Sequence, residues 1–80
     1  MGREEIISEL VARKVPKDRA VIYCDAFLEY REASENITRN GVIVAHPRTG
    51  APMTNPYVAI REAALKKLAG MRDVPAAFLW

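Results

Sequence analysis

The chain contains very few of the residues that usually carry chemistry, with one cysteine and one histidine among its 80 residues. A single cysteine excludes an internal disulfide, and one cysteine with one histidine cannot supply the four ligands of a usual zinc site. The four glycines are scattered and do not form the GxxxxGK phosphate loop of ATPases. We therefore expect no metal, no cofactor and no ATP hydrolysis, and the chain is predicted not to be an enzyme.

Long apolar runs and a strong excess of one charge are also lacking. No apolar run approaches the roughly 18 residues of a membrane span, so no membrane partner is expected. The first residues carry acids ahead of the apolar positions, unlike a signal peptide, and with the lone thiol this favours a cytoplasmic location. The net charge of +2 does not by itself indicate a nucleic-acid-binding protein.

Apolar residues, in contrast, are abundant and make up 50% of the chain. A chain of this length buries only about 60–65% of its unfolded surface, so its core is small. Such chains usually need a disulfide, a metal or oligomerisation for stability. Since the first two are not expected, we predict that residues 1–80 form a single oligomerisation domain.

Local signals predict two helices in the first half of the chain. Residues 3–14 form a short amphipathic pattern, which Pro16 ends. A long helix is expected from residue 17 to Asn40, because Asn40 and Gly41 both tolerate the left-handed conformation that stops a helix. This helix is apolar over more than one stripe and therefore needs more than one packing partner.

The stretch 41–68 reads as a β-hairpin followed by a helix. Residues 42–45 are rich in β-branched side chains, residues 46–50 carry turn residues, and residues 51–54 lead back. Asn55 is a favoured helix cap and Pro56 a favoured first helical residue. The apolar stripe expected on this last helix comprises Tyr57, Ile60, Ala64, Leu68 and Met71.

The predicted fold class is mainly α. A short N-terminal helix lies within residues 1–16, a helical hairpin with a small β-hairpin in its connection spans 17–71, and a tail follows over 72–80. The apolar faces of the helices favour an oligomer. The residues expected to hold helices and neighbouring subunits together are Tyr23, Phe27, Leu28, Tyr30, Ile60, Leu65 and Leu68.

Short motifs occur in a fixed order along the same region. The sequence reads DRA at 18–20, YCDAF at 23–27, YREA at 30–33, GVIV at 41–44, Gly50, NP at 55–56 and ALKKL at 64–68. In order and spacing these motifs resemble the phage terminase small subunit, the non-catalytic half of the motor that packages viral DNA. After the last helix only Pro75 matches the family's GLTPSxR-like run.

The resemblance implies a ring of identical subunits that recruits double-stranded DNA to the large ATPase and nuclease subunit and regulates it. The implied partners are other copies of the chain, the large subunit and double-stranded DNA, bound weakly and without sequence specificity, in the cytoplasm of the host cell. About 17 residues precede the long helix, fewer than a helix-turn-helix domain requires. The expected type is therefore a short form without a full N-terminal DNA-binding domain.

Basic residues are the candidate contacts to DNA phosphates. They lie around Pro16, at the hairpin tip and near the end of the last helix, and comprise Arg13, Lys14, Lys17, Arg19, Arg48, Lys66 and Lys67. Basic residues in these places equally suit the helix dipole or a solvated turn. In a ring each weak contact would be repeated in every copy and would add through avidity.

The apolar end of the chain, Phe78, Leu79 and Trp80, has two interpretations. It either folds back to complete a small core, or forms a docking peptide for the large subunit, for which aromatic residues are good anchors. A competing function for the whole chain is a small dimeric phage adaptor or regulatory protein that binds partners through its helices. A ring favours the terminase interpretation and a dimer favours the adaptor.

Overall fold

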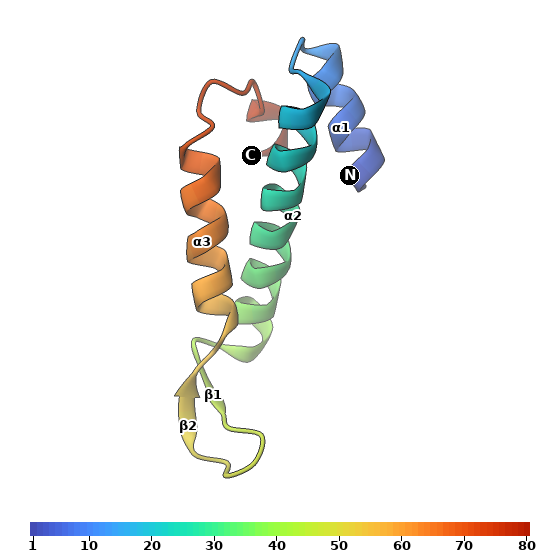
Figure 1. Ribbon diagram of the computed structural model, residues 1–80. Coiled ribbons are helices and arrows are strands. Elements are labelled where there is room, and N and C mark those ends of the chain that lie inside the picture. The colour runs from blue at the N-terminus through green and yellow to red at the C-terminus, as the bar shows by residue number, and fades with distance from the viewer.

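Three helices and one β-hairpin make up the structure, a computed structural model that describes residues 1–80 (Figure 1). In chain order the elements are α1 (Arg3–Ala12), α2 (Lys17–Asn40), β1 (Ile43–Ala45), β2 (Pro52–Thr54), α3 (Tyr57–Ala69) and a 3₁₀ turn over Ala77–Leu79. The molecule is rod-like, with extents of 50 × 22 × 19 Å. The predicted mainly α class with a small antiparallel hairpin is confirmed.

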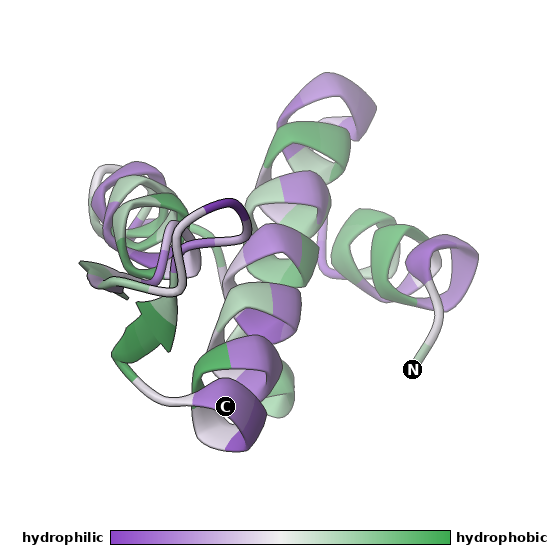
Figure 2. Cartoon of the chain, turned by 90° about the horizontal axis from the view of Figure 1, so that it is seen from below, coloured by the Kyte–Doolittle hydropathy of each residue, from purple (hydrophilic) through white to green (hydrophobic).

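Helix α2 lies between the other two helices, as both views show (Figures 1 and 2). On one side α1 buries Ile6, Ile7 and Leu10. On the other side α3 runs antiparallel to α2 and buries Ala64 and Leu68. The prediction that the long helix needs more than one packing partner is therefore met within a single chain.

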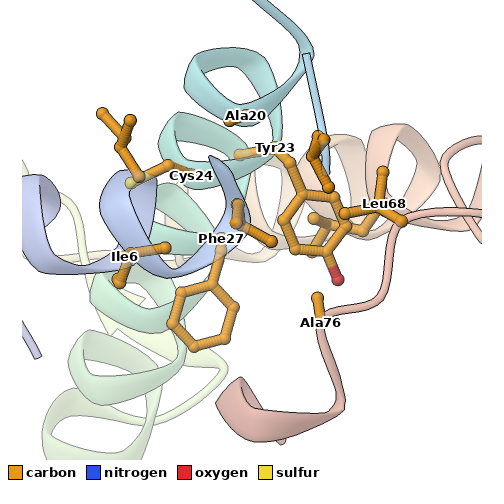
Figure 3. Close-up of a cluster of buried hydrophobic side chains, with 12 residues drawn as sticks. Ile6, Ala20, Tyr23, Cys24, Phe27, Leu68 and Ala76 are labelled. Carbon is orange, nitrogen blue, oxygen red and sulfur yellow. The ribbon is translucent and has the colours of Figure 1, made fainter. Parts of the chain in front are cut away.

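The hydrophobic core is gathered at the end where α2 begins and α3 ends (Figure 3). Its members come from all three helices and from the segment 72–80, which contributes Val74 and Ala76. Only 16 of the 80 residues are buried. Toward the hairpin the buried side chains are Ala33, Ile37 and Ala64, so that half of the helix pair has little apolar bulk to hold it.

Helix α3 turns a slightly different face to α2 than the sequence predicts. Ala64 and Leu68 are buried as expected, but Ile60 is 41% exposed and Arg61 is half-buried in its place. Positions 57, 61, 64 and 68 are spaced by four, three and four residues, the repeat of helices packed side by side. Arg61 can occupy this face because its methylene groups pack on apolar surface while the guanidinium reaches solvent.

A left-handed residue, Lys14 with φ 68°, ends α1 and directs the chain into α2. The N–H of Val15 donates to the carbonyl of Leu10, and the N–H of Lys14 donates to that of Val11. This pair of bonds is a Schellman motif, and the buried Val15 supplies its usual apolar contact. The helix predicted over 3–14 therefore ends two residues early, at Ala12.

Asn55, the only buried polar residue, fixes the point where the chain reverses direction. Its Nδ2 donates to Oδ1 of Asn36 at 3.0 Å and to the carbonyl of Gly41 at 2.9 Å. Its Oδ1 accepts from the N–H of Tyr57 at 3.0 Å, so Asn55 does bond to the start of α3, although the helix begins at Tyr57 and not at Pro56 as predicted. One side chain thus joins the end of α2, the base of the hairpin and the start of α3.

We expect Asn55→Ala to lower the free energy of unfolding by about 2–3 kcal/mol, because it removes three hydrogen bonds and leaves buried partners unsatisfied. Urea denaturation followed by far-UV circular dichroism measures this change. The matched control is Asn36→Ala, which removes one of the three bonds from a half-buried side chain and should cost less than about 1 kcal/mol. An Asn55→Ala variant as stable as the control would contradict this role for Asn55.

Candidate nucleic-acid interface

The predicted phosphate contacts lie at the two ends of the rod. Arg13, Lys14, Lys17 and Arg19 flank the turn between α1 and α2, whereas Lys66 and Lys67 lie in the last turn of α3. Since α3 is antiparallel to α2, these two groups share one end of the molecule (Figure 1). Arg48 lies in the hairpin loop at the opposite end and is therefore separate from the rest.

A surface cleft of about 290 Å³ lies between the α1–α2 turn and the segment 72–80. Its charged residues are Arg13, Lys14, Arg19 and Asp73. Lys17 instead borders a separate hollow beside α1. The structure therefore brings three of the predicted phosphate contacts into one cleft and leaves the others outside it.

The two arginines of this cleft already have partners within the chain. Arg19 donates through Nη2 to both carboxylate oxygens of Asp73, at 2.8 and 2.9 Å. Arg13 donates to the carboxylate and the carbonyl of Glu9, and its guanidinium lies 4.2 Å from the centre of the Phe78 ring. Both ion pairs are partly exposed to solvent, and such pairs each contribute only about 0–1 kcal/mol.

Asp73 is the cleft residue that sequence reasoning missed. Its partner is 54 positions away in the chain, so no local pattern reveals the contact. The available signal was its isolation, because it is the only acidic residue after Glu62 and it directly follows Arg72.

The segment 72–80 folds back onto α2. The indole Nε1 of Trp80 donates to the Tyr23 hydroxyl at 3.0 Å, and the indole lies 5.3 Å from the rings of both Phe27 and Tyr30. Phe78 is half-buried against the core, whereas Trp80 remains 60% exposed. In the isolated chain the segment therefore completes the core, and docking to the large subunit by Phe78, Leu79 and Trp80 stays a prediction.

The predicted subunit-packing residues fall into three groups by exposure. Those buried in the chain's own core are Tyr23, Phe27 and Leu68 (Figure 3). Those half-buried are Leu28 and Tyr30. Ile60 and Leu65 are each 41% exposed, so these two are the members that remain most available to a neighbouring copy.

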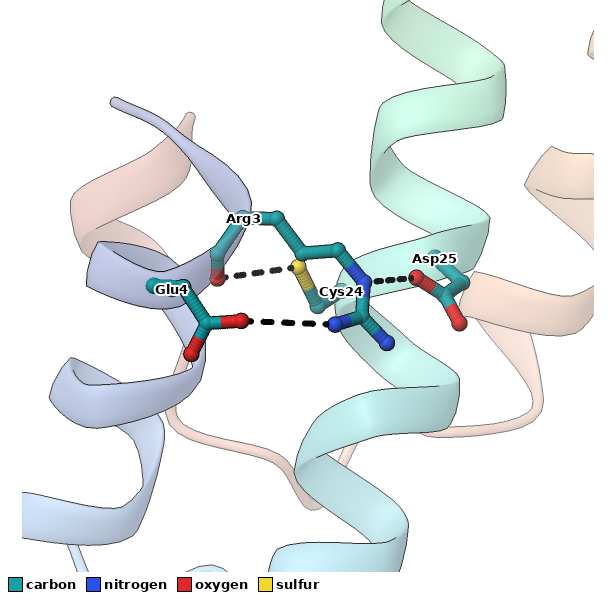
Figure 4. Close-up of polar contacts among 4 residues, drawn as sticks. All are labelled: Arg3, Glu4, Cys24 and Asp25. Carbon is teal, nitrogen blue, oxygen red and sulfur yellow. Dashed lines mark hydrogen bonds and ion pairs between the residues drawn. The ribbon is translucent and has the colours of Figure 1, made fainter.

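Arg3 and Cys24 form the polar part of the contact between α1 and α2 (Figure 4). The Nε of Arg3 donates to Oδ1 of Asp25 at 3.0 Å, and a second guanidinium nitrogen lies 3.6 Å from the carboxylate of Glu4. The thiol of Cys24 donates to the carbonyl of Arg3 at 3.6 Å and is fully buried. Burial, and secondarily the charge of Asp25, raises the pKa of the Cys24 thiol.

The remaining candidate groups have structural partners. Nδ1 of His46 accepts from the backbone N–H groups of Arg48 at 3.1 Å and Thr49 at 3.4 Å, and so holds the hairpin turn. No cluster of three or more His, Cys, Asp or Glu side chains could hold a metal ion. None of the helices combines the length and the apolar character needed to cross a membrane.

Comparison with known proteins decides the family. The family model described as phage terminase, small subunit, matches residues 3–73. The chain belongs to the phage terminase small subunit family. The match includes all three helices and the hairpin, and it extends through Asp73. Comparison with curated proteins and comparison with solved structures each gave no match.

Membership in the terminase small subunit family assigns the chain to phage DNA packaging, which confirms the resemblance seen in the motifs. Small subunits of this family are generally non-catalytic.

The buried thiol makes the stability of this small subunit depend on pH. Because the pKa of Cys24 is higher in the folded chain, the unfolded chain loses its proton first as the pH rises past the ordinary thiol pKa of 9.0. The thiol's contribution is complete below that pH and is lost as the pH rises toward the folded pKa. We expect urea denaturation to show lower stability at about pH 10 than at about pH 8.

The Cys24→Ala variant is the control, since it removes the titrating group. Its stability should fall less between the same two pH values. An equal fall in both proteins would show that the thiol contributes nothing to the pH dependence.

Proposed function

We propose that copies of this chain assemble into a ring that recruits double-stranded DNA and presents it to the large, ATP-hydrolysing subunit, whose activity the ring regulates. Family membership supports the role in DNA packaging. The observation that most supports a ring is the apolar surface that a single chain leaves exposed.

The chain is more extended and more exposed than a compact monomer of its length. Its radius of gyration is 15.2 Å, whereas a compact domain of this length has about 12 Å. Large apolar side chains are exposed along the rod, including Ile22 at 54%, Ile43 at 59% and Leu65 at 41%. Figure 2 shows a strongly hydrophobic strand of the hairpin at the edge of the molecule. Packing against other copies would cover these residues.

The exposed apolar residues lie on different surfaces, which favours a ring over a symmetric dimer. Leu65 borders an apolar groove together with Tyr23 and Trp80, and Ile22 lies outside this groove. An interface that joins two different surfaces of the same chain leaves one of each free for a further copy, and it forms a ring when the rotation between copies closes. A two-fold dimer would use one surface twice.

The basic end of the rod supplies the DNA contacts in this proposal. Lys66 and Lys67 are exposed at the same end as the cleft-lining arginines. Single contacts to phosphates are weak, but a ring repeats them in every copy. Contact with the large subunit is assigned to Phe78, Leu79 and Trp80, whose exposed indole offers an aromatic anchor.

Light scattering behind size exclusion, at two protein concentrations, tests the ring. We expect a mass of about eight subunits or more that does not change on dilution, as a closed ring requires. A stable dimer would favour the phage adaptor interpretation instead, and a monomer would refute the assembly.

A pair of variants locates the interface on α3. Leu65→Glu should lower the mass to smaller species while the helical circular dichroism is retained, because a charge replaces an exposed apolar contact. Ala63→Glu adds the same charge to the same helix at an exposed small residue on its opposite side, and should leave the mass unchanged. Equal effects of the two substitutions would remove Leu65 from the interface.

A further inference from the structure

We propose that the cleft between the α1–α2 turn and the segment 72–80 binds a phosphate of the DNA backbone. In the structure, residues of the chain itself hold the two arginines of this cleft, and DNA would displace them. The inference rests on the proposed recruitment of DNA. It adds where one phosphate contact lies and that residues of the same chain compete for it.

The cleft concentrates positive charge from three consecutive pieces of chain. Arg13 follows the end of α1, Lys14 is the left-handed residue of the turn, and Arg19 belongs to the first turn of α2. Helix α2 begins there without a side-chain cap, so the positive end of its dipole adds to the field. Against these groups the cleft holds one carboxylate, that of Asp73, while Glu9 pairs with Arg13 from α1.

Asp73 bonds to only one nitrogen of the Arg19 guanidinium. Both carboxylate oxygens of Asp73 are bound by a single nitrogen, Nη2, and the structure gives Nη1 and Nε of Arg19 no acceptor. A phosphate can take the guanidinium as a fork through two parallel hydrogen bonds, which is the stronger geometry. The side chains of Arg19 and Asp73 are 41% and 73% exposed, so a phosphate can reach the pair from solvent.

The same segment also touches the second arginine of the cleft. Phe78 lies beneath the guanidinium of Arg13, five residues after Asp73. A phosphate bound to Arg19 competes with Asp73 of this segment. One bound to Arg13 competes with Glu9 for the N–H groups and leaves Phe78 on the face of the guanidinium. Because coupling of this kind is reciprocal, DNA should loosen the segment, and loosening the segment should strengthen DNA binding.

The first experiment measures DNA affinity by fluorescence anisotropy of a labelled duplex of about 30 base pairs at several salt concentrations. We expect Asp73→Asn to raise the affinity about two- to fivefold, the range that loss of one exposed ion pair allows. The matched control is Asp18→Asn, which makes the same change in charge at the start of α2, on an exposed side chain outside the cleft. It should raise the affinity less.

A double substitution separates release of Arg19 from the general gain in charge. In an Arg19→Ala background, Asp73→Asn should raise the affinity no more than Asp18→Asn does. The single variant Arg19→Ala should bind DNA more weakly than the unmodified chain and reduce the slope of affinity against salt.

The second experiment uses Trp80, the only tryptophan, as a reporter of the segment. Trp80 is 60% exposed, but its packing on Phe27 and its bond to Tyr23 should keep acrylamide quenching in the free protein below that of a free indole. Saturation with the duplex should increase the quenching, and Asp73→Asn should increase it before DNA is added. Asp18→Asn should not.

Three results would overturn the inference: an Asp73→Asn gain no larger than that of Asp18→Asn, a gain that persists without Arg19, or unchanged quenching of Trp80 at saturating DNA. Failure of all variants to bind the duplex would overturn it as well. Measuring the mass of the same samples separates failure of the cleft proposal from failure of the ring proposal. A ring with an inert Asp73→Asn variant rejects the cleft alone, and a monomer with the expected gain rejects the ring alone.

Discussion

The buried amide of Asn55 is the contact on which the arrangement of the helices depends. An antiparallel helix pair requires the chain to reverse, and here it does so through strands of three residues each. A two-stranded hairpin alone is barely stable in water. Asn55 compensates by fixing the end of α2, the hairpin base and the start of α3 together. The apolar contacts of Ala33 and Ala64 are too small to set this geometry by themselves.

The positions of the elements were predictable because they depend on local chemistry. Pro16, the Asn40–Gly41 pair and Asn55 each act within a few residues of their own backbone. The predicted end of α2 at Asn40 agrees with the structure, whereas α1 ends two residues early, and α3 begins at Tyr57 and ends at Ala69, so Met71 lies beyond it. The face of α3 was predicted less well. Hydropathy alone selected Ile60, whereas the spacing of helix packing selects Arg61, whose stem is apolar although its end is charged.

The candidate site was likewise predictable where it depends on local sequence and not where it depends on contacts between distant residues. Clustering of basic residues around Pro16 was visible in the sequence, but the cleft that uses Arg13 and Arg19 depends on where the segment 72–80 lies. That path is set by contacts such as the bond from Trp80 to Tyr23, across 57 positions. The sequence offered two interpretations of this segment, and no local signal could choose between them.

The weakness of the contacts around the cleft suits the proposed assembly, which would have to hold DNA and also let it move. A buried ion pair would be costly to open, whereas the exposed pair of Arg19 and Asp73 is worth about 0–1 kcal/mol and can exchange with a phosphate. One such exchange would change the DNA affinity of a single chain very little. In a ring the same small difference is repeated in every copy, so binding becomes strong while each contact stays easy to break. Sequence-independent contacts of this kind allow a protein to slide along DNA. A tighter, buried phosphate site in each subunit would oppose the translocation that packaging requires.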